Sequence, residues 1–342
     1  MNLDLPLIWA GLIAAAVLLY VVLDGFDLGI GVLFPFARTE TDRDVMMNSI
    51  APVWDGNETW LVLGGGGLLA AFPLAYSVLM PAFYLPVLLM LMGLILRGVA
   101  FEFRFRGRRR GKIGWGLAFG GGSLLAAFSQ GLVLGGFIQG VRVEDGRFAG
   151  GPFDWLTPYT LLVAAGVVAG YALLGAGWLI LKTDDELHGD ARRWGWISGA
   201  VVSVVLAAVS LATLFVHPQI AQRWGVTAAG LEWDRLLPLL AVPGLGLVGL
   251  AVLVEGLRRR THHHLPILGA FLMFLSGFLG LAVGFFPYVV PYAYSYEQAA
   301  AADNALALML AGTAFILPLV LGYTVWVYWI FRGKVAPDAH YH

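Results

Sequence analysis

Four carboxylates lie in two short stretches of a chain that is otherwise strongly apolar. Asp24 and Asp27 are three residues apart and would share one face of a helix. Asp55 and Glu58 have the same spacing in a later stretch. Carboxylates that gather with few counter-charges hold protons more tightly than isolated ones, so they can accept a proton from water and pass it on. The spacing predicts a proton route, or a site related to quinone chemistry, formed by these residues.

A single arginine accompanies these carboxylates at membrane depth. Arg97 lies near the end of an apolar run, and Glu102 follows it after about one helical turn. We expect Arg97 and Glu102 to form structural ion pairs, with Glu102 facing the basic loop that comes next. In the alternative interpretation, Asp24, Asp27 and Arg97 form a buried ion-pair network, and Asp55 only caps its helix.

The remaining side chains argue against a metal or haem on this chain. Membrane haems are usually held by His or Met ligands. The histidines are expected in loops, in the tail or at an outer helix end, and the mid-helix methionines are better explained as flexible apolar filler. With no cysteine, the chain has no disulfide, thiolate metal site or iron–sulfur ligand. The seven histidines are His188, His217, His262, His263, His264, His340 and His342.

Composition places these residues in a membrane protein. Of the 342 residues, 59% are apolar and only 13% are charged, and the mean hydropathy is +0.78. Soluble domains have roughly 45–50% apolar and about 25% charged residues, so the chain must be covered by lipid. The net charge of -1 provides no electrostatic attraction for nucleic acid, which is therefore excluded as a partner.

Nine apolar runs are long enough to cross the bilayer, which takes about 20 residues. We predict an all-α integral membrane protein in which nine helices pack as bundles, forming a single polytopic domain over residues 1–342. A tight turn marked by Pro73, Tyr76, Ser77 and Pro81 is expected between the second and third helices. The predicted helices cover residues 5–36, 55–76, 80–104, 113–140, 156–181, 194–217, 235–256, 265–287 and 304–331.

The distribution of Lys and Arg predicts the orientation. Loops on one side of this nine-helix arrangement hold 16 of these residues, and loops on the other side hold four. Because positive loops stay in the cytoplasm, the N-terminus is expected outside and the C-terminus in the cytoplasm. The first helix does not resemble a cleaved signal peptide. A signal peptide begins with a basic region, whereas Asp4 precedes this helix.

Two long motifs resemble subunit II of the cytochrome bd-type quinol oxidases. They are LDGFDLG at residues 23–29 and NSIAPVWDGNETW at residues 48–60. The similarity extends over nearly the whole chain, and residues 57–67 look most like the cyanide-insensitive branch of the family. Further matching stretches are GGGG at 64–67, AFP at 71–73, FY at 83–84, RGVAFE at 97–102 and FPYVVP at 286–291.

This resemblance implies a complex in the bacterial cytoplasmic membrane. A haem-bearing subunit I would oxidise quinol and reduce oxygen to water on b- and d-type haems, and some members have a small third subunit. Subunit II carries no haem ligand in this family. Its acids corresponding to Asp24, Asp27 and Asp55 are thought to line a proton route, whereas the position of Glu58 can be Gln. The tryptophan corresponding to Trp54 lies near a structural quinone in some members.

We therefore expect a non-haem subunit II that supports subunit I in the respiratory chain and contributes to proton uptake from the cytoplasm. Whether the donor is ubiquinol or menaquinol stays open. A secondary transporter or ion channel is the alternative from another class, but transporters usually show related halves and binding sites near the midplane. A purely structural partner subunit, in which the acids only pack, is a third interpretation.

Overall fold

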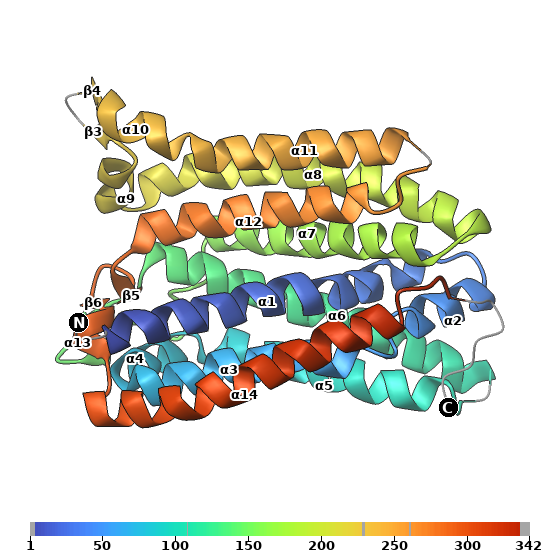
Figure 1. The fold of residues 1–342 in the computed structure, drawn as a ribbon, viewed down its shortest axis with the longest axis horizontal. Coiled ribbons are helices and arrows are strands. Elements are labelled where there is room, and N and C mark those ends of the chain that lie inside the picture. The colour runs from blue at the N-terminus through green and yellow to red at the C-terminus, as the bar shows by residue number, and fades with distance from the viewer. Residues whose placement is uncertain (1–3, 108, 228–229, 260, 336–342) are drawn as a thin grey trace.

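The computed structural model describes residues 4–107, 109–227, 230–259 and 261–335, and most of them are helical. The long helices run roughly side by side along one axis, as Figure 1 shows, and three two-stranded antiparallel hairpins connect helix ends. The helices are α1 (Leu5–Leu33), α2 (Glu40–Asn48), α3 (Trp54–Ala71), α4 (Pro73–Ala82), α5 (Tyr84–Arg104), α6 (Arg109–Gln139), α7 (Pro158–Lys182), α8 (Asp185–Val216), α9 (Pro218–Arg223), α10 (Trp233–Leu239), α11 (Ala241–Arg258), α12 (Leu265–Phe285), α13 (Tyr296–Ala299) and α14 (Asp303–Ile330), with a 3-10 turn, η1, at Phe34–Phe36. The hairpins pair β1 (Val143–Glu144) with β2 (Arg147–Phe148), β3 (Val226–Thr227) with β4 (Gly230–Leu231), and β5 (Tyr288–Val290) with β6 (Tyr294–Ser295).

Eight helical segments of the described residues are long and apolar enough to cross a membrane. This confirms the all-α membrane architecture. Helix α3 is not among the eight because Asp55, Asn57 and Glu58 occupy its first turns. At 1.5 Å per residue, its 18 residues extend about 27 Å, close to the thickness of the hydrocarbon core. A total of nine spanning helices, with α3 as the ninth, stays a prediction.

The expected tight turn at residues 73–81 is wrong. These residues form helix α4, so α3 ends at Ala71 and α5 begins only at Tyr84. Pro73 occupies the first turn of α4, where its missing N–H loses no hydrogen bond and its fixed φ favours the helix. The chain breaks instead at Phe72, whose φ of -131° and ψ of 64° end α3.

Two other helix boundaries also differ from the expectation. The helix expected over 194–217 begins at Asp185, because the polar segment before residue 194 continues the same helix. The helix expected over 235–256 is divided at Leu240 into α10 and α11. Pro238, which lies inside α10, interrupts the backbone hydrogen bonds just before this break.

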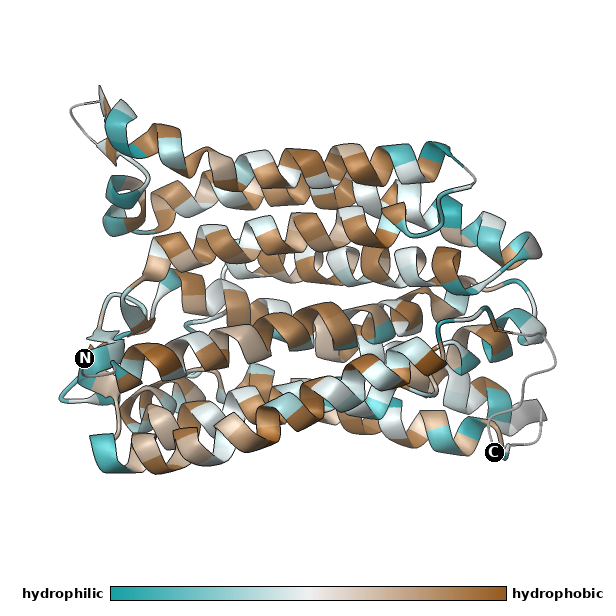
Figure 2. Ribbon diagram, viewed as in Figure 1, coloured by the Kyte–Doolittle hydropathy of each residue, from teal (hydrophilic) through white to brown (hydrophobic). Residues whose placement is uncertain are grey.

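The sides of the helices are hydrophobic, and their ends are hydrophilic. Figure 2 shows hydrophobic residues along the middle of the bundle and hydrophilic residues concentrated at both ends. Helices α1 and α7 pack against each other in the interior, α3, α5 and α6 lie on one side of them, and α12, α11 and α8 lie on the other (Figure 1). Helix α14 crosses α1 and α3 and keeps most of its apolar surface exposed. The apolar flanks are therefore available to lipid or to another subunit.

The packing of α1 against α7 depends on two glycines close to its aspartates. A Cβ atom at Gly29 would lie 1.8 Å from the carbonyl oxygen of Tyr171, and one at Gly25 would lie 2.9 Å from the Tyr171 ring. Close helix packing through small residues is the usual means of association in lipid. The glycine face of α1 thus packs on α7, which leaves Asp24 and Asp27 on a different face.

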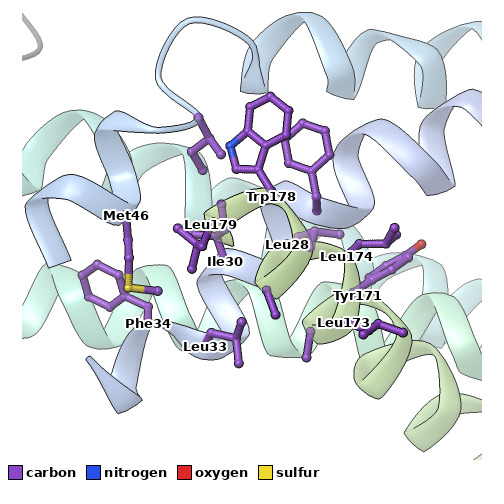
Figure 3. Packing of buried hydrophobic residues seen from close by; sticks show 14 of the residues in the cluster. Leu28, Ile30, Leu33, Phe34, Met46, Tyr171, Leu173, Leu174, Trp178 and Leu179 are labelled. Carbon is purple, nitrogen blue, oxygen red and sulfur yellow. The ribbon is translucent and has the colours of Figure 1, made fainter. Parts of the chain in front are cut away.

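The main buried cluster fixes the C-terminal halves of α1 and α7. Figure 3 shows Leu28, Ile30 and Leu33 of α1 beside Leu174, Trp178 and Leu179 of α7. The ring of Trp178 stacks on Phe26 with centroids 4.2 Å apart, and its indole N–H donates to the Ser49 carbonyl oxygen at 3.2 Å. This contact also attaches the segment between α2 and α3 to the core.

Because the native chain lacks cysteine, single cysteines can report the orientation. Asp145 lies in the exposed turn between β1 and β2, and Thr261 is exposed between α11 and α12. We expect a membrane-impermeant maleimide to label Asp145→Cys in intact cells and to label Thr261→Cys only after permeabilisation. The reverse labelling pattern would show that the predicted orientation is inverted.

Candidate functional site

One buried guanidinium joins three helices at the centre of the candidate site. Arg97 of α5 donates from Nη1 to Asp24 Oδ1 of α1 at 2.6 Å, and from Nη2 to Glu58 Oε2 of α3 at 2.8 Å. The side chains of Arg97 and Asp24 are 2% and 0% exposed, whereas Glu58 is 31% exposed. The planar fork of arginine suits this bridging position because it can donate to two carboxylates at once.

Close packing of α5 against α6 positions Arg97. A Cβ atom at Gly93 would lie 2.6 Å from the Gly122 carbonyl oxygen, and one at Gly122 would lie 2.9 Å from the Arg97 backbone nitrogen. On its other side, the guanidinium carbon lies 5.9 Å from the ring centroid of Trp54. Glycines on both helices therefore let the backbones approach and direct the arginine towards α1 and α3.

The second aspartate of α1 has a separate set of partners. Asn57 of α3 donates from Nδ2 to Asp27 Oδ2 at 2.7 Å, and Tyr328 of α14 donates its hydroxyl to Asn57 Oδ1 at 2.9 Å. Asp24 Oδ2 and Asp27 Oδ1 are buried without a hydrogen-bond partner among the described residues. Leaving such acceptors unpaired is unfavourable, particularly when the group is charged.

The four carboxylates differ systematically in their exposure to water. Asp55 is exposed in the first turn of α3, Glu58 one turn further is partly exposed, and Asp24 and Asp27 are fully buried. The N-cap of α3 is Val53, so Asp55 is not the capping residue that the structural interpretation assumed. The structure brings Asp24, Glu58 and Arg97 into direct contact, and it connects Asp27 to them through neighbouring residues of α1 and α3.

Arg97 and Glu102, the two residues expected in ion pairs, lie in different surroundings. Arg97 points into the bundle and pairs with Asp24 and Glu58, whereas Glu102 is exposed. Residues five apart on a helix do not share a face, which explains the difference. A second buried ion cluster forms around Arg104, the last residue of α5.

Arg104 holds helix α2 against the C-terminal end of α5 and the N-terminal end of α6. Its guanidinium donates to Glu40 Oε2 at 2.8 Å and also to Asp44, and Lys112 donates to the second Asp44 oxygen at 3.1 Å. The Arg104 guanidinium carbon also lies 5.1 Å from the ring centroid of Phe34. This cluster covers the inner end of the bundle next to the candidate site.

The C-terminal end of α14 is attached to α7 and α8, which places Tyr328 beside Asn57. The ammonium of Lys182 donates to the carbonyl oxygens of Phe331 and Gly333, and Val335 N–H donates to the Lys182 carbonyl oxygen at 2.9 Å. Lys334 donates to the exposed carboxylate of Asp184 and holds the pKa of that carboxyl below its usual range.

Sequence reasoning missed Asn57 and Tyr328. Asn57 lies between Asp55 and Glu58 in the sequence, so its polar side chain within this motif could have identified it as a site residue. Tyr328 is separated from its partner by 271 residues, and nothing in the local pattern singles it out. Only the crossing of α14 over α1 and α3 brings it to the site.

The described histidines do not form a haem site. His188 lies in the first turn of α8 rather than in a loop, His262, His263 and His264 lie between α11 and α12, and His217 precedes α9. In the described residues, no histidine lies in the middle of a spanning helix, and no group of three His, Cys, Asp or Glu side chains could hold a metal ion. His340 and His342 lie outside the described residues.

Comparison with known proteins identifies similar chains. The sequence profile of the cytochrome bd terminal oxidase subunit II family matches residues 5–331. The chain is 30% identical to the probable cytochrome oxidase subunit 2 of Haemophilus influenzae and 27% identical to the cytochrome bd-I ubiquinol oxidase subunit 2 of Escherichia coli K12, covering 98% of this chain and 96% of each relative. A chain in the structure of the bd oxidase from Geobacillus thermodenitrificans has the same fold, with a TM-score of 0.74 and 18% identity over 97% of this chain and all of that one.

Removing the central guanidinium should destabilise the protein strongly. Arg97→Gln leaves Asp24 buried beside Glu58 without its counter-charge, which is expected to lower the free energy of unfolding by about 3–5 kcal/mol. Thermal unfolding of the solubilised protein measures this loss. Arg142→Gln is the matched control, because Arg142 pairs with Glu144 at an exposed surface.

A double variant separates the ion pair from other effects of the substitution. Adding Asp24→Asn to Arg97→Gln removes the unpaired charge, so part of the lost stability should return. A double variant no more stable than Arg97→Gln would show that the Asp24–Arg97 interaction does not stabilise the fold.

Proposed function

This chain belongs to the cytochrome bd terminal oxidase subunit II family, and we propose that its cluster of Asp24, Glu58, Arg97 and Asp27 delivers protons to the oxidase. As a member of that family it is one subunit of a quinol oxidase complex, with a subunit I partner and with haems in the complex. The transporter interpretation is not supported. The proposal concerns what this subunit contributes to the reaction.

The observation that carries the proposal is the order of exposure along α3 and α1. A proton from water can first reach Asp55, which is exposed, and then Glu58, which is partly exposed. Asp24 accepts a hydrogen bond from Nη1 of Arg97, and Glu58 accepts one from Nη2, so the guanidinium joins the two carboxyl groups. The route therefore leads from the exposed start of α3 into the interior of the bundle.

Charge balance within the cluster supports proton exchange. Asp24 and Glu58 bind one guanidinium, which remains protonated under all ordinary conditions, and Asp27 lies three residues further along α1 with Asn57 as its hydrogen-bond donor. The group is neutral only when two of the three carboxyl groups carry protons. A low-dielectric environment disfavours uncompensated charge, so protons can be exchanged between neighbouring carboxyl groups without any movement of the helices.

The exposed surface of α3 suggests where subunit I binds. Cβ atoms at Gly56, Gly65 and Gly66 would meet nothing within 4 Å, and Val62 on the same helix is 71% exposed. Small residues that are open on a membrane helix permit close approach of another helix. We propose that subunit I covers this surface. In that position the haems of subunit I would lie a short distance from the cluster that supplies the protons.

The finer assignments are consistent with this arrangement. We propose that haem ligands come from subunit I, since the described histidines of this chain lie at helix ends and in connections. Trp54 packs against Phe101 with ring centroids 5.0 Å apart and is only partly buried, so its free edge can contact a structural quinone. With the predicted orientation, Asp55 would lie on the cytoplasmic side of a bacterial inner membrane. A small third subunit is compatible with the exposed apolar surface of α14.

Substitution of the carboxylates tests the proton route. We expect Asp24→Asn and Asp55→Asn to lower quinol-dependent oxygen uptake by about tenfold or more, because neither amide can accept and release a proton. Oxygen uptake is measured on purified complexes whose haem content per subunit equals that of the wild type. Asp145→Asn serves as the control, because Asn is equally suited to the Asp-Gly turn of the outer hairpin.

The same variants distinguish a purely structural role. Fully assembled Asp24→Asn and Asp55→Asn complexes with wild-type turnover would refute the proton route. Reduced turnover that is explained entirely by lost haem or lost subunit I would show that the acids contribute only to packing.

A further inference from the structure

A hydrogen-bonded chain of three side chains leads from α7 to Asp24, away from the exposed carboxylates. The Tyr171 hydroxyl of α7 donates to Gln130 Oε1 of α6 at 2.6 Å. Gln130 Nε2 then donates to the Tyr20 hydroxyl of α1 at 2.7 Å. Tyr20 precedes Asp24 by four residues, so the two buried side chains lie on the same face of α1.

Each hydrogen bond in this chain is donated in the direction of Asp24. Tyr171 and Gln130 each act as donors to the next member, so the oxygen of Tyr20 accepts and its own proton is left to be donated. The nearest carboxyl group along α1 is Asp24, whose Oδ2 is buried without a partner in the described part of the chain. The chain therefore presents a hydroxyl donor to the side of Asp24 that Arg97 does not contact.

The members are held in place by the same packing that joins α1 to α7. Tyr20 and Tyr171 are 4% and 1% exposed. The Tyr171 ring lies over Gly25, where a Cβ atom would be only 2.9 Å away, and it stacks on Phe274 with centroids 6.1 Å apart. Both tyrosines thus have little freedom to choose other partners.

The central member cannot relay protons. A glutamine amide does not titrate, so it donates and accepts hydrogen bonds without releasing a proton to its neighbour. Beyond Gln130 the chain ends at Tyr171, which is enclosed by α1 and Phe274. Its chemistry therefore suits it for orienting Asp24 rather than for conducting protons.

We propose that Tyr20, Gln130 and Tyr171 form a positioning arm that aims the Asp24 carboxyl group at Arg97 and adjusts its proton affinity through the Tyr20 hydroxyl. This inference rests on the proposed proton uptake through Asp24. Charged and titratable groups from every neighbouring helix contribute to the environment of Asp24, and they are Asp27 of α1, Glu58 of α3, Arg97 of α5, Tyr171 of α7 and Tyr328 of α14.

The pH dependence of oxygen uptake tests the arm. Tyr20→Phe removes the donor but keeps the ring, and Gln130→Met removes both hydrogen bonds of the amide at a similar volume. We expect each to move the alkaline limb of the turnover profile upwards by about one pH unit, because the ionised form of Asp24 loses the stabilising dipole of an oriented hydroxyl group beside it. The measurement uses the purified complex with a soluble quinol, at matched haem content.

A neighbouring residue supplies the control. Ser129 of α6 is buried next to Gln130, and its hydroxyl has no hydrogen-bond partner among the described residues. Ser129→Ala should therefore leave the pH profile unchanged. Tyr171→Phe, which removes only the far end of the arm, should shift the profile in the same direction but less than Tyr20→Phe.

The possible outcomes separate this inference from the proposed function. Turnover that falls equally at every pH in Tyr20→Phe and Gln130→Met, or a profile that does not shift, overturns the arm even when Asp24→Asn abolishes turnover. Wild-type turnover in Asp24→Asn instead refutes the proton route. A shift in both arm variants, with none in Ser129→Ala, supports the positioning role.

Discussion

The fork of Arg97 between Asp24 and Glu58 is the interaction on which the site depends. It joins α5 to α1 and α3 at a point where both the arginine and the aspartate are removed from solvent. Burying an ion pair is unfavourable unless hydrogen bonds compensate for the lost hydration, and such pairs are weak evidence for stability by themselves. Their presence in a membrane interior is therefore better explained by function, since the same carboxyl groups could have been replaced by apolar side chains.

Helix α1 combines two requirements in one short segment. Gly25 and Gly29 allow α7 to approach, while Asp24 and Asp27 face the charged side chains of α3 and α5. Moving either pair by one position would rotate the aspartates away from Arg97 or place a Cβ atom against the backbone of α7. The packing of the bundle and the chemistry of the site thus constrain the same residues.

The spacing of Asp24 and Asp27 and the nearby Arg97 could be recognised in the local sequence, and the structure buries all three side chains. Their role in a proton route stays a prediction. Glu102 lies five residues after Arg97 and therefore on another face of α5. Pro73 was interpreted as part of a turn, although proline begins helices as readily as it ends them. Tyr328, Gln130 and Tyr171 could not be found, because their roles arise only when helices distant in sequence pack together.

Time-resolved proton uptake by the purified oxidase tests the central role of Asp24 most directly. When the reduced enzyme reacts with oxygen in a weakly buffered solution, a pH-indicator dye reports protons taken up, and haem absorbance reports the reaction with oxygen. We expect Asp24→Asn to bind oxygen at the wild-type rate but to take up protons at least about ten times more slowly, which in turn limits its steady-state turnover. Uptake at the wild-type rate and stoichiometry in Asp24→Asn would contradict a proton route through this residue.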